Sequence, residues 1–309
     1  MLDIVSKRKW FFIFSTLIIV PGVVFLALGG LRLGIDFTGG TIWELQFKQP
    51  VQSLEVKSVL AASGYPEAQV QIAEGSTALI RTRELKEGST EKARLSQALR
   101  DRFGDFTELQ IQTVGPSVGT EITRRAVMAV GLTSLGILLY IAYAFRQAQH
   151  PFRFGLCAIL AMLHDVLVVL GIFAILGYFF GVEIDALFVT ALLTVIGFSV
   201  HDTIVVFDRI RENVIRRAGR NFEDIVNYSL IQTLARSITT SLTVLFTLLA
   251  LYLFGGATIR NFILALLIGI LSGTFSSIFN ASLLLVVWEN RELSAFFNRF
   301  RRGGRPAPA

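Results

Sequence analysis

Long apolar segments separated by short polar connections dominate the chain. A helix needs about 20 mostly apolar residues to cross the hydrocarbon core of a bilayer. Six segments meet that length: 10–30, 126–145, 154–181, 186–207, 234–254 and 262–288. We therefore predict six membrane-spanning helices. The first segment follows the basic run Lys7-Arg8-Lys9 and is longer than the apolar part of a signal peptide, so we interpret it as a membrane anchor.

The one large polar region, residues 31–125, has a different pattern. Apolar and polar residues alternate in 41–48, 68–74, 77–83 and 106–114, which predicts four strands. Residues 51–64 and 89–104 have helical periodicity, and Ser89 or Thr90 is the expected N-cap of the second helix. The order β-α-β-β-α-β is typical of a ferredoxin-like α+β domain. The region has no nucleotide-binding glycine loop, metal-ligand cluster or nucleophile–base pair, so we predict neither a cofactor nor enzymatic catalysis.

Composition agrees with an α-helical polytopic membrane protein, because 53% of the residues are hydrophobic and 17% are charged. Lys and Arg gather before the first span, between spans 2 and 3, between spans 4 and 5, and after span 6, whereas the two short connections on the other side contain only Arg260. By the positive-inside rule, both termini are predicted to be cytoplasmic. These basic flanks account for the net charge of +6, and no nucleic-acid partner is expected.

The predicted division is a cytoplasmic N-terminus with the first span (1–30), an extracytoplasmic domain (31–125), spans 2–6 (126–288) and a basic cytoplasmic tail (289–309). Between spans 4 and 5, Asn221 precedes two acidic residues, which predicts the start of a helix at the cytoplasmic interface. A solvated loop is the alternative. The single cysteine, Cys157, excludes an internal disulfide.

Four polar residues inside the predicted spans fall at a similar depth. At ~1.5 Å per residue, Asp202 and Asp165 lie ~25 Å and ~24 Å from the outer ends of their spans, and Arg236 and Asn280 each lie ~29 Å in. Ionisable groups are costly in hydrocarbon and are usually functional there. We interpret the four residues as one polar layer in the inner half of the membrane.

Helical spacing extends this layer into stripes. The stripes are Arg236, Thr239, Thr240, Thr243 and Thr247 in the fifth span, Gly273, Ser276, Ser277 and Asn280 in the sixth, and Thr190, Thr194, Gly197 and His201 in the fourth. The alternative interpretation of the Gly, Ser and Thr residues is close helix packing with interhelical hydrogen bonds.

Asp202 and Arg236 are predicted to lie opposite each other, because an opposite charge lowers the cost of burying each. An Asp that alternates between a paired and a water-exposed state changes its proton affinity, so proton binding and release on opposite sides of a membrane can drive a change of shape. A static ion pair that fixes packing is the alternative. His164 and His201, beside the two acids, either titrate or only donate hydrogen bonds.

At these residues the chain resembles the SecF family, which consists of subunits of the bacterial protein-export machinery related to RND transporters. The similar stretches are GIDFTGGT (34–41), VGPSVGTEI (114–122), HDVLVVLG (164–171), GFSVHDTIVVFDRIREN (197–213), QTLARSITTS (232–241) and GTFSSIFNAS (273–282). The resemblance implies a six-helix RND-like transmembrane bundle with the ferredoxin-like domain between helices 1 and 2.

The resemblance also implies partners and a role. The partners would be SecD, with which the chain would form a twelve-span unit, the Sec channel (SecYEG), unfolded preprotein and the lipid of the bacterial plasma (inner) membrane. Together with SecD, the chain would use a proton or sodium gradient to pull preproteins across the membrane after ATP-driven translocation.

Site residues carried over from the family are ion-coupling Asp202 and Arg236, with Asp165 as the acid of the third span. His201, Thr239, Thr240, Ser276 and Asn280 are the supporting polar layer. Asp36, Gly39 and Gly40 are expected to form a hinge just outside the first span, with a plain turn as the alternative. These hinge residues belong to the stretch DFTGG (36–40).

Two other functions remain open. An RND-type small-molecule exporter needs two such halves, and the chain contains no second copy of the domain-plus-bundle pattern. In a purely structural assembly subunit, the polar layer would only hold helices together. Ion-dependent activity of charge variants separates this last alternative from a SecF-like role.

Overall fold

The chain divides into a helical unit and an α+β unit. In the computed structural model, the helical unit comprises residues 1–32 and 129–309, and the α+β unit comprises residues 33–128. The structure describes residues 3–73, 76–146, 151–256 and 259–290. The predicted basic tail from 291 onward and Gly75, which lies between the strands predicted at 68–74 and 77–83, are outside the described residues.

The α+β unit contains a four-stranded antiparallel sheet with strand order β2-β3-β1-β4. The elements are β1 (Gly40–Phe47), α3 (Ser53–Ala62), β2 (Gln69–Ala73), β3 (Thr77–Thr82), α4 (Thr90–Phe103) and β4 (Phe106–Val114). A short helix, α2 (Ile35–Thr38), precedes β1. The predicted ferredoxin-like β-α-β-β-α-β order is confirmed.

The core of this unit lies between the sheet and its two helices. Trp43 and Leu45, two residues apart on β1, point to the same face, and both are fully buried. Leu60 on α3 and Leu95 on α4 are buried in the same cluster. The side chain of Ser89 accepts a hydrogen bond from the backbone N–H of Lys92, so the predicted cap begins α4.

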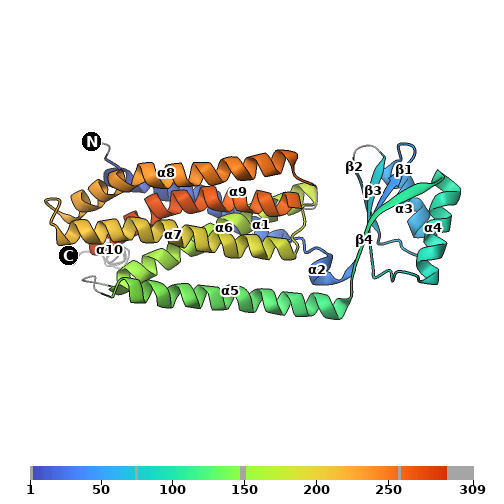
Figure 1. Cartoon of the computed structure of the whole chain (residues 1–309), viewed down its shortest axis with the longest axis horizontal. Helices are drawn as coiled ribbons and strands as arrows, with labels where there is room; N and C mark the ends of the chain where they lie inside the picture. The colour runs from blue at the N-terminus through green and yellow to red at the C-terminus, as the bar shows by residue number, and fades with distance from the viewer. Residues whose placement is uncertain (1–2, 74–75, 147–150, 257–258, 291–309) are drawn as a thin grey trace, which may run out of the picture. The chain divides into compact units, whose positions relative to one another are not determined.

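Six helical stretches among the described residues are long and apolar enough to cross a membrane, as predicted. They are α1 (Arg8–Gly29), α5 (Pro116–Ala144), α6 (Pro151–Phe180), α7 (Ala186–Ile215), α8 (Phe222–Phe254), and a sixth stretch made of α9 (Arg260–Phe275), η3 (Ser276–Ala281) and α10 (Ser282–Glu289). Figure 1 shows α6, α7, α8 and α9 running side by side. The apolar stretch of α5 is 6% buried, against 50% for that of α7, so most of α5 is left to face lipid or a partner.

Both ends of the described chain meet the start of α8. The backbone N–H of Ile4, just before the short helix η1 (Val5–Lys7), donates to Asn227 Oδ1 at 2.8 Å. Asn290, which follows α10, donates from Nδ2 to Glu223 Oε1 at 2.6 Å. The start of α1 and the end of α10 therefore lie at the same end of the bundle (Figure 1), which fits the even number of spans.

Three helices extend well beyond the predicted spans, and α7 ends at Ile215 rather than near 207. Helix α5 begins at Pro116 rather than near 126, because proline suits the first position of a helix and the polar residues after it lowered the apolar signal. Helix α8 begins at Phe222 and continues to Phe254 without a break, so the predicted interfacial helix and the fifth span are one helix. Asn221 caps it by accepting from the backbone N–H of Asp224 at 2.8 Å.

Helices α1 and α6 approach each other at two glycines. A Cβ atom built on Gly171 would lie 2.7 Å from the Cα of Gly22, and the reverse substitution would give the same distance. Small residues allow helix backbones to come this close within a membrane. Ser15 and His164 lie seven residues, or two helical turns, before Gly22 and Gly171, so the two helices run parallel and bring this second pair together.

The sixth span changes its hydrogen-bonding pattern in its middle. Residues Ser276–Ala281 form one turn of π-helix, η3, between α9 and α10. Single π-helical turns inside α-helices are frequent at functional sites. Ser276, Ser277 and Asn280, which belong to the predicted polar stripe, all lie in η3 and are buried.

Candidate functional site

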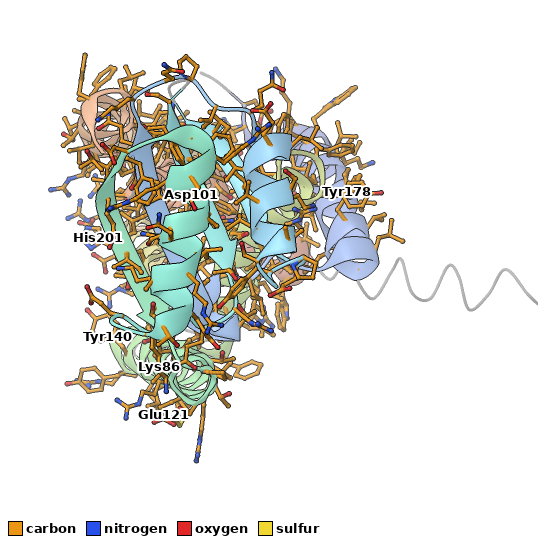
Figure 2. The ribbon with its side chains drawn as sticks, turned by 90° about the vertical axis from the view of Figure 1, so that its right-hand side faces the viewer. Lys86, Asp101, Glu121, Tyr140, Tyr178 and His201 are labelled. Carbon is orange, nitrogen blue, oxygen red and sulfur yellow. The ribbon has the colours of Figure 1, made fainter. Side chains whose placement is uncertain are left out.

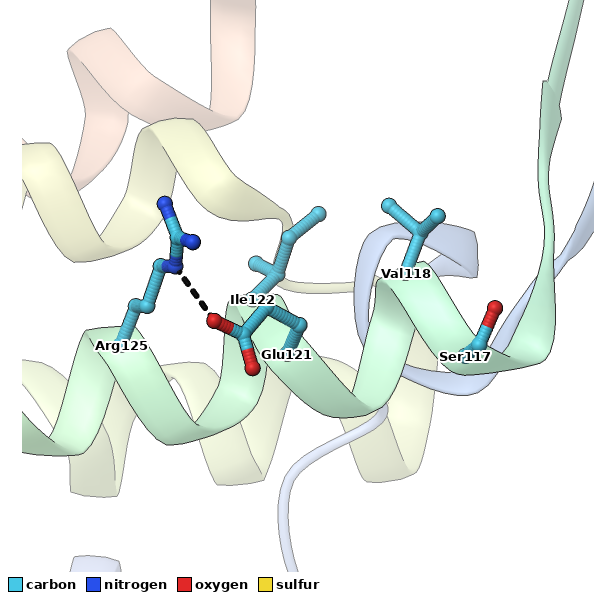
Figure 3. Close-up of a pocket in the computed structure, with 5 residues that line it drawn as sticks. All are labelled: Ser117, Val118, Glu121, Ile122 and Arg125. Carbon is cyan, nitrogen blue, oxygen red and sulfur yellow. Dashed lines mark hydrogen bonds and ion pairs between the residues drawn. The ribbon is translucent and has the colours of Figure 1, made fainter.

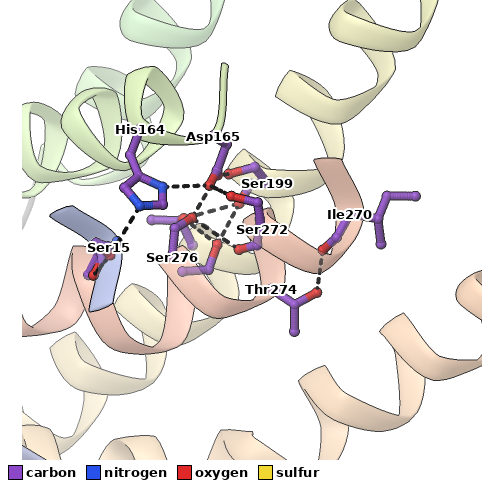
Figure 4. Close-up of polar contacts among 12 residues, drawn as sticks. Ser15, His164, Asp165, Ser199, Ile270, Ser272, Thr274 and Ser276 are labelled. Carbon is purple, nitrogen blue, oxygen red and sulfur yellow. Dashed lines mark hydrogen bonds and ion pairs between the residues drawn. The ribbon is translucent and has the colours of Figure 1, made fainter. Parts of the chain in front are cut away.

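A buried carboxylate, Asp165 on α6, is the centre of the largest polar network in the described part of the helical unit. Its Oδ2 accepts hydrogen bonds from the hydroxyls of Ser199 on α7 at 2.5 Å and Ser276 on η3 at 2.6 Å. Its Oδ1 accepts from Ser272 on α9 at 2.8 Å and contacts Nδ1 of His164 at 3.0 Å. Figure 4 shows these groups converging on the carboxylate. Asp165 is 1% exposed, and these four partners compensate the burial of its charge.

The network continues from His164 to α1 and η3. The other ring nitrogen of His164, Nε2, lies 3.1 Å from the hydroxyl of Ser15. Asn280 Nδ2 donates to the same hydroxyl at 2.8 Å. A cavity of about 270 Å³ adjoins this chain, and Ser15, Thr16, His164 and Asn280 provide its polar lining. Asp165 and Asn280, which were predicted to share a depth, are thus connected through two intermediate residues.

Asp202 and Arg236 do not form the predicted ion pair. Asp202 is buried in α7, and its Oδ2 has no hydrogen-bond partner. Arg236 is exposed on α8, and the ion pairs among the described residues do not include it. The prediction was wrong because residue counting fixes the height of a side chain along a helix but not the direction in which it points. The described residues therefore leave the charges of both groups uncompensated.

Arg236 belongs to a polar face that is turned away from the bundle. The other members of this face on α8 are also exposed: Thr239, Thr240, Thr243 and Thr247. The stripe on α7 is exposed as well: Thr190, Thr194, Gly197 and His201. Figure 2 shows the labelled His201 side chain at the outer edge of the ribbon. The polar layer thus splits into a buried part around Asp165 and an exposed part around Arg236.

Three serines of the Asp165 network were not predicted as site residues. Ser15 lies in the apolar run of α1, Ser199 lies between Gly197 and His201 of the predicted α7 stripe but on another face of the helix, and Ser272 precedes the predicted stripe on α9. The signal available in the sequence was weak, because a serine inside a membrane span is most often a packing residue. What identifies them is their position in one network: Ser199 and Ser272 donate to the Asp165 carboxylate, and Ser15 contacts the His164 ring that Asp165 holds.

The two predicted hinge glycines lie close to other backbone segments of the α+β unit. Gly39 has φ +76°, and a Cβ atom there would lie 2.9 Å from the Cα of Pro116. Gly40 has φ +132°, and a Cβ atom would lie 2.7 Å from the carbonyl oxygen of Thr82. Both positions therefore require glycine for conformation and for space. Asp36, before them, accepts a long hydrogen bond of 3.4 Å from Gln112.

A second pocket, of about 370 Å³, lies along the first turns of α5 (Figure 3). Glu121 and Arg125, which line it, are bonded to each other at 2.7 Å one helical turn apart, and both are largely exposed. This pair is a surface salt bridge of small energetic effect. Among the described residues, no group of three or more His, Cys, Asp or Glu side chains is arranged to hold a metal ion.

Two family models match the chain. The model of the C-terminal part of the protein export membrane proteins SecD and SecF matches residues 94–291, and the model of the SecD/SecF GG motif matches residues 24–51. The first match alone covers more than half of the sequence.

The chain belongs to the SecD/SecF family. Among the relatives similar to it, the protein translocase subunit SecF of Thermobaculum terrenum is 63% identical over 97% of this chain and 98% of the relative. The SecF of Anaerolinea thermophila is 45% identical over the full length of both. SecDF of Bacillus subtilis is 36% identical over 94% of this chain, but over only 38% of its own length.

Solved SecDF structures have the same fold. The crystal structure of SecDF, a translocon-associated membrane protein, from Thermus thermophilus matches with a TM-score of 0.81 and 36% identity, over 94% of this chain and 39% of that one. This SecD/SecF family member therefore spans about two fifths of a SecDF chain. The predicted RND-like fold class is confirmed. Asp165, Asp202 and Arg236 lie within the matched SecD/SecF segment, and Gly39 and Gly40 lie within the GG-motif match.

Proposed function

We propose that this chain is an ion-gradient-coupled subunit of a protein-export complex, which acts with a SecD-type six-helix partner to pull preproteins across the bacterial plasma membrane after ATP-driven translocation. The observation that carries the proposal is Asp202, a buried carboxylate in a membrane helix with an oxygen that has no partner. Keeping this carboxylate permanently charged inside the membrane would cost several kcal/mol. The position is therefore suited to a carboxyl group that gains and loses a proton or a cation.

The exposed polar face supports the proposed partner. Arg236 and the threonines beside it lie on membrane-spanning α8 and point away from the bundle. A guanidinium facing lipid at this depth is unfavourable, whereas a second helical unit could supply an acceptor and exclude lipid. The lengths fit as well, because this chain corresponds to about two fifths of SecDF, which carries both names in one chain.

The other two functions are less well supported. A small-molecule exporter finds no support in the names of the relatives, which are those of protein translocase subunits. In a purely structural subunit, buried charges are expected to be satisfied, and Asp165 fits that description. Asp202 does not, because its Oδ2 is unpartnered.

The proposed setting is a bilayer with both termini in the cytoplasm. The meeting of the start of α1 and the end of α10 at one end of the bundle supports termini on one side, and the basic residues between α7 and α8 support the cytoplasmic side. The Sec channel and an unfolded preprotein would then meet the α+β unit on the outer side. That unit is the proposed grip on the emerging preprotein.

The test is export of a preprotein into inverted membrane vesicles that contain this chain and its partner, with and without an imposed proton or sodium gradient. Asp202→Asn keeps the size of the side chain and removes its charge, so the gradient-dependent part of export is expected to be lost while the ATP-dependent part remains. Arg236→Met is expected to act likewise, and the double variant to be no worse than either single one. Asp208→Asn is the matched control, because Asp208 is an exposed acid on the same helix that pairs with Arg211 at 2.7 Å.

Protein abundance is measured in parallel. If the two residues only fixed packing, each single variant would lower abundance, and any loss of export would follow the loss of protein. Normal gradient-stimulated export by a stably inserted Asp202→Asn variant would contradict the proposed function.

A further inference from the structure

We propose that His164, held by Asp165, is a second proton-binding residue of this subunit, and that protons reach it through Ser15 from the cavity beside α1. The inference rests on the proposed function only for its use in ion coupling, since proton binding itself can be measured separately. Its basis is the chain of contacts from Asp165 through His164 and Ser15 to Asn280.

Asp165 is arranged to remain an acceptor. Each of its two carboxylate oxygens has two partners, and three of the four are serine hydroxyls that donate to it. If Asp165 were protonated, one of these serine hydroxyls would have to rotate away to make room for the new proton. Inside the bundle, the rotated hydroxyl would have no water to bond. The group in this network that can take up a proton without breaking that shell is the imidazole of His164.

His164 has a suitable partner for both of its protonation states. When the ring is neutral, Nδ1–H donates to Asp165 and Nε2 accepts from the hydroxyl of Ser15. When the ring is charged, Nε2–H donates to the Ser15 oxygen, and the Ser15 proton must turn elsewhere. Asn280 provides that alternative, because its Oδ1 lies 3.1 Å from the hydroxyl and its Nδ2 lies 2.8 Å from it.

The proton step needs no group other than water. A hydronium ion in the cavity transfers a proton to Ser15 Oγ, and Ser15 transfers its own proton to Nε2 of His164. One O–H bond of the hydronium ion breaks as a new O–H bond forms on Ser15, and the original O–H bond of Ser15 breaks as an N–H bond forms on His164. Water is left behind, and His164 gains one proton and one positive charge. The fixed negative charge of Asp165, 3.0 Å from the other ring nitrogen, stabilises the product.

Water has room to reach this point. The cavity of about 270 Å³ would hold several waters at roughly 30 Å³ each. Most of its wall is apolar, but Ser15, Thr16, His164 and Asn280 supply polar partners on one part of it, and the His164 side chain is 12% exposed. By contrast, Asp165 is 1% exposed, so the histidine is the accessible member of the pair.

Asp165 is the charged group bonded to His164 among the described residues. Helices α1, α7 and α9, together with η3 and α10, pack against α6. The titratable and charged groups on these elements are Arg8 and Lys9 on α1, His201, Asp202 and the cluster 208–212 on α7, Arg260 on α9 and Glu289 on α10. Arg8 and Glu289 have their own partners, Glu223 and Arg153, and within the described ranges His164 forms its salt bridge with Asp165 alone.

The experiment uses the full-length chain with its partner in lipid nanodiscs, labelled with ¹⁵N-histidine. The ring signals are followed by NMR between pH 5 and 9, the range in which histidine changes charge, and the His164 signals are assigned by their loss in His164→Gln. We expect reversible protonation of His164. Ser15→Ala should move its midpoint by about half a pH unit to one pH unit, the size expected for one hydrogen bond.

Thr16→Val is the matched control. Thr16 is the neighbour of Ser15 and lines the same cavity, but its hydroxyl donates to the backbone oxygen of Phe12. We expect an unchanged midpoint in this variant. In vesicles, His164→Gln should lower the gradient-dependent part of export about 100-fold or more, the range expected for a lost proton-transfer group.

The outcomes separate the two proposals. A His164 ring that keeps one protonation state throughout, or a midpoint that moves equally in Ser15→Ala and Thr16→Val, overturns the inference whatever Asp202 does. Normal gradient-dependent export by His164→Gln overturns its coupling role. If His164 titrates and its variant loses coupling while Asp202→Asn exports normally, the inference stands and the assignment of coupling to Asp202 fails.

Discussion

Replacing Gly171 by alanine tests whether the close crossing of α1 and α6 positions Ser15 against His164. The added Cβ atom would lie 2.7 Å from the Cα of Gly22, whereas ordinary contacts begin at 3.4 Å. The obstacle is backbone, so no side chain can rotate to make room. The two helices must separate by about 0.7 Å or deform.

The consequences can be estimated from these distances. Overpacking of this kind costs about 1–3 kcal/mol of stability. If the separation is carried two turns along the parallel helices, the contact between Ser15 and His164 lengthens from 3.1 Å to about 3.8 Å. That distance is too long for a hydrogen bond, so Gly171→Ala should also change the titration of His164 as Ser15→Ala does.

The assay is thermal or denaturant unfolding of the purified chain in bicelles, with the histidine titration measured on the same samples. Gly136→Ala is the matched control, because Gly136 lies in membrane helix α5 and a Cβ atom there meets nothing within 4 Å. Alanine has the higher helix propensity, so the control should be neutral or slightly stabilising. Equal stability of Gly171→Ala and Gly136→Ala, with an unchanged His164 midpoint, would refute the reasoning.

Three further predictions follow from the fold. Gly269→Ala would place a Cβ atom against the methyl groups of Val195, so Val195→Ala should partly rescue it. The coupling free energy in unfolding measurements should be about 1–3 kcal/mol, and additive effects would contradict this contact. The segment 40–115 alone should unfold cooperatively in urea, and Ser89→Ala should lower its stability by about 1 kcal/mol; a gradual, non-cooperative transition would count against it. A cysteine introduced at Arg216 should react with an impermeant thiol reagent only from the cytoplasmic side, and one at Asp105 only from outside; the reverse labelling would overturn the proposed orientation.

Much of the fold could be predicted because local signals agree with it. In the α+β unit, period-2 alternation in β1 and the cap at Ser89 mark elements whose ends the structure reproduces within one or two residues. Apolar length alone located the six spans. The helix ends that were missed, at Pro116, Ile215 and Phe222, lie where a helix leaves the apolar region, because hydropathy reports the surroundings of a helix and not its backbone.

The site could be predicted only in part, because sequence spacing gives depth and face but not which face meets which helix. Asp165 and Asn280 were predicted from their depth, and His164 was noted beside Asp165, but Ser15, which connects His164 to Asn280, had no distinguishing signal. The Asp202–Arg236 pairing was inferred from equal depth and is absent within this chain. Which residues of two helices contact each other depends on how the helices pack, and sequence spacing does not determine that packing.

The π-helical turn η3 has a consequence for how tolerant the sixth span is to changes in length. Its position in the middle of the span means that the buried face of α10, formed by Ser282, Leu283, Leu285 and Val286, is in register with the bundle only through this wider turn. Each residue of an α-helix rotates the chain by about 100°. Deleting a single residue from the span while the wider turn is kept would rotate α10 by about 100° relative to α9 and carry part of its buried face out of the bundle. Conservative side-chain changes in η3 should therefore be accepted far more readily than any one-residue insertion or deletion, so chain length itself is a determinant of this site.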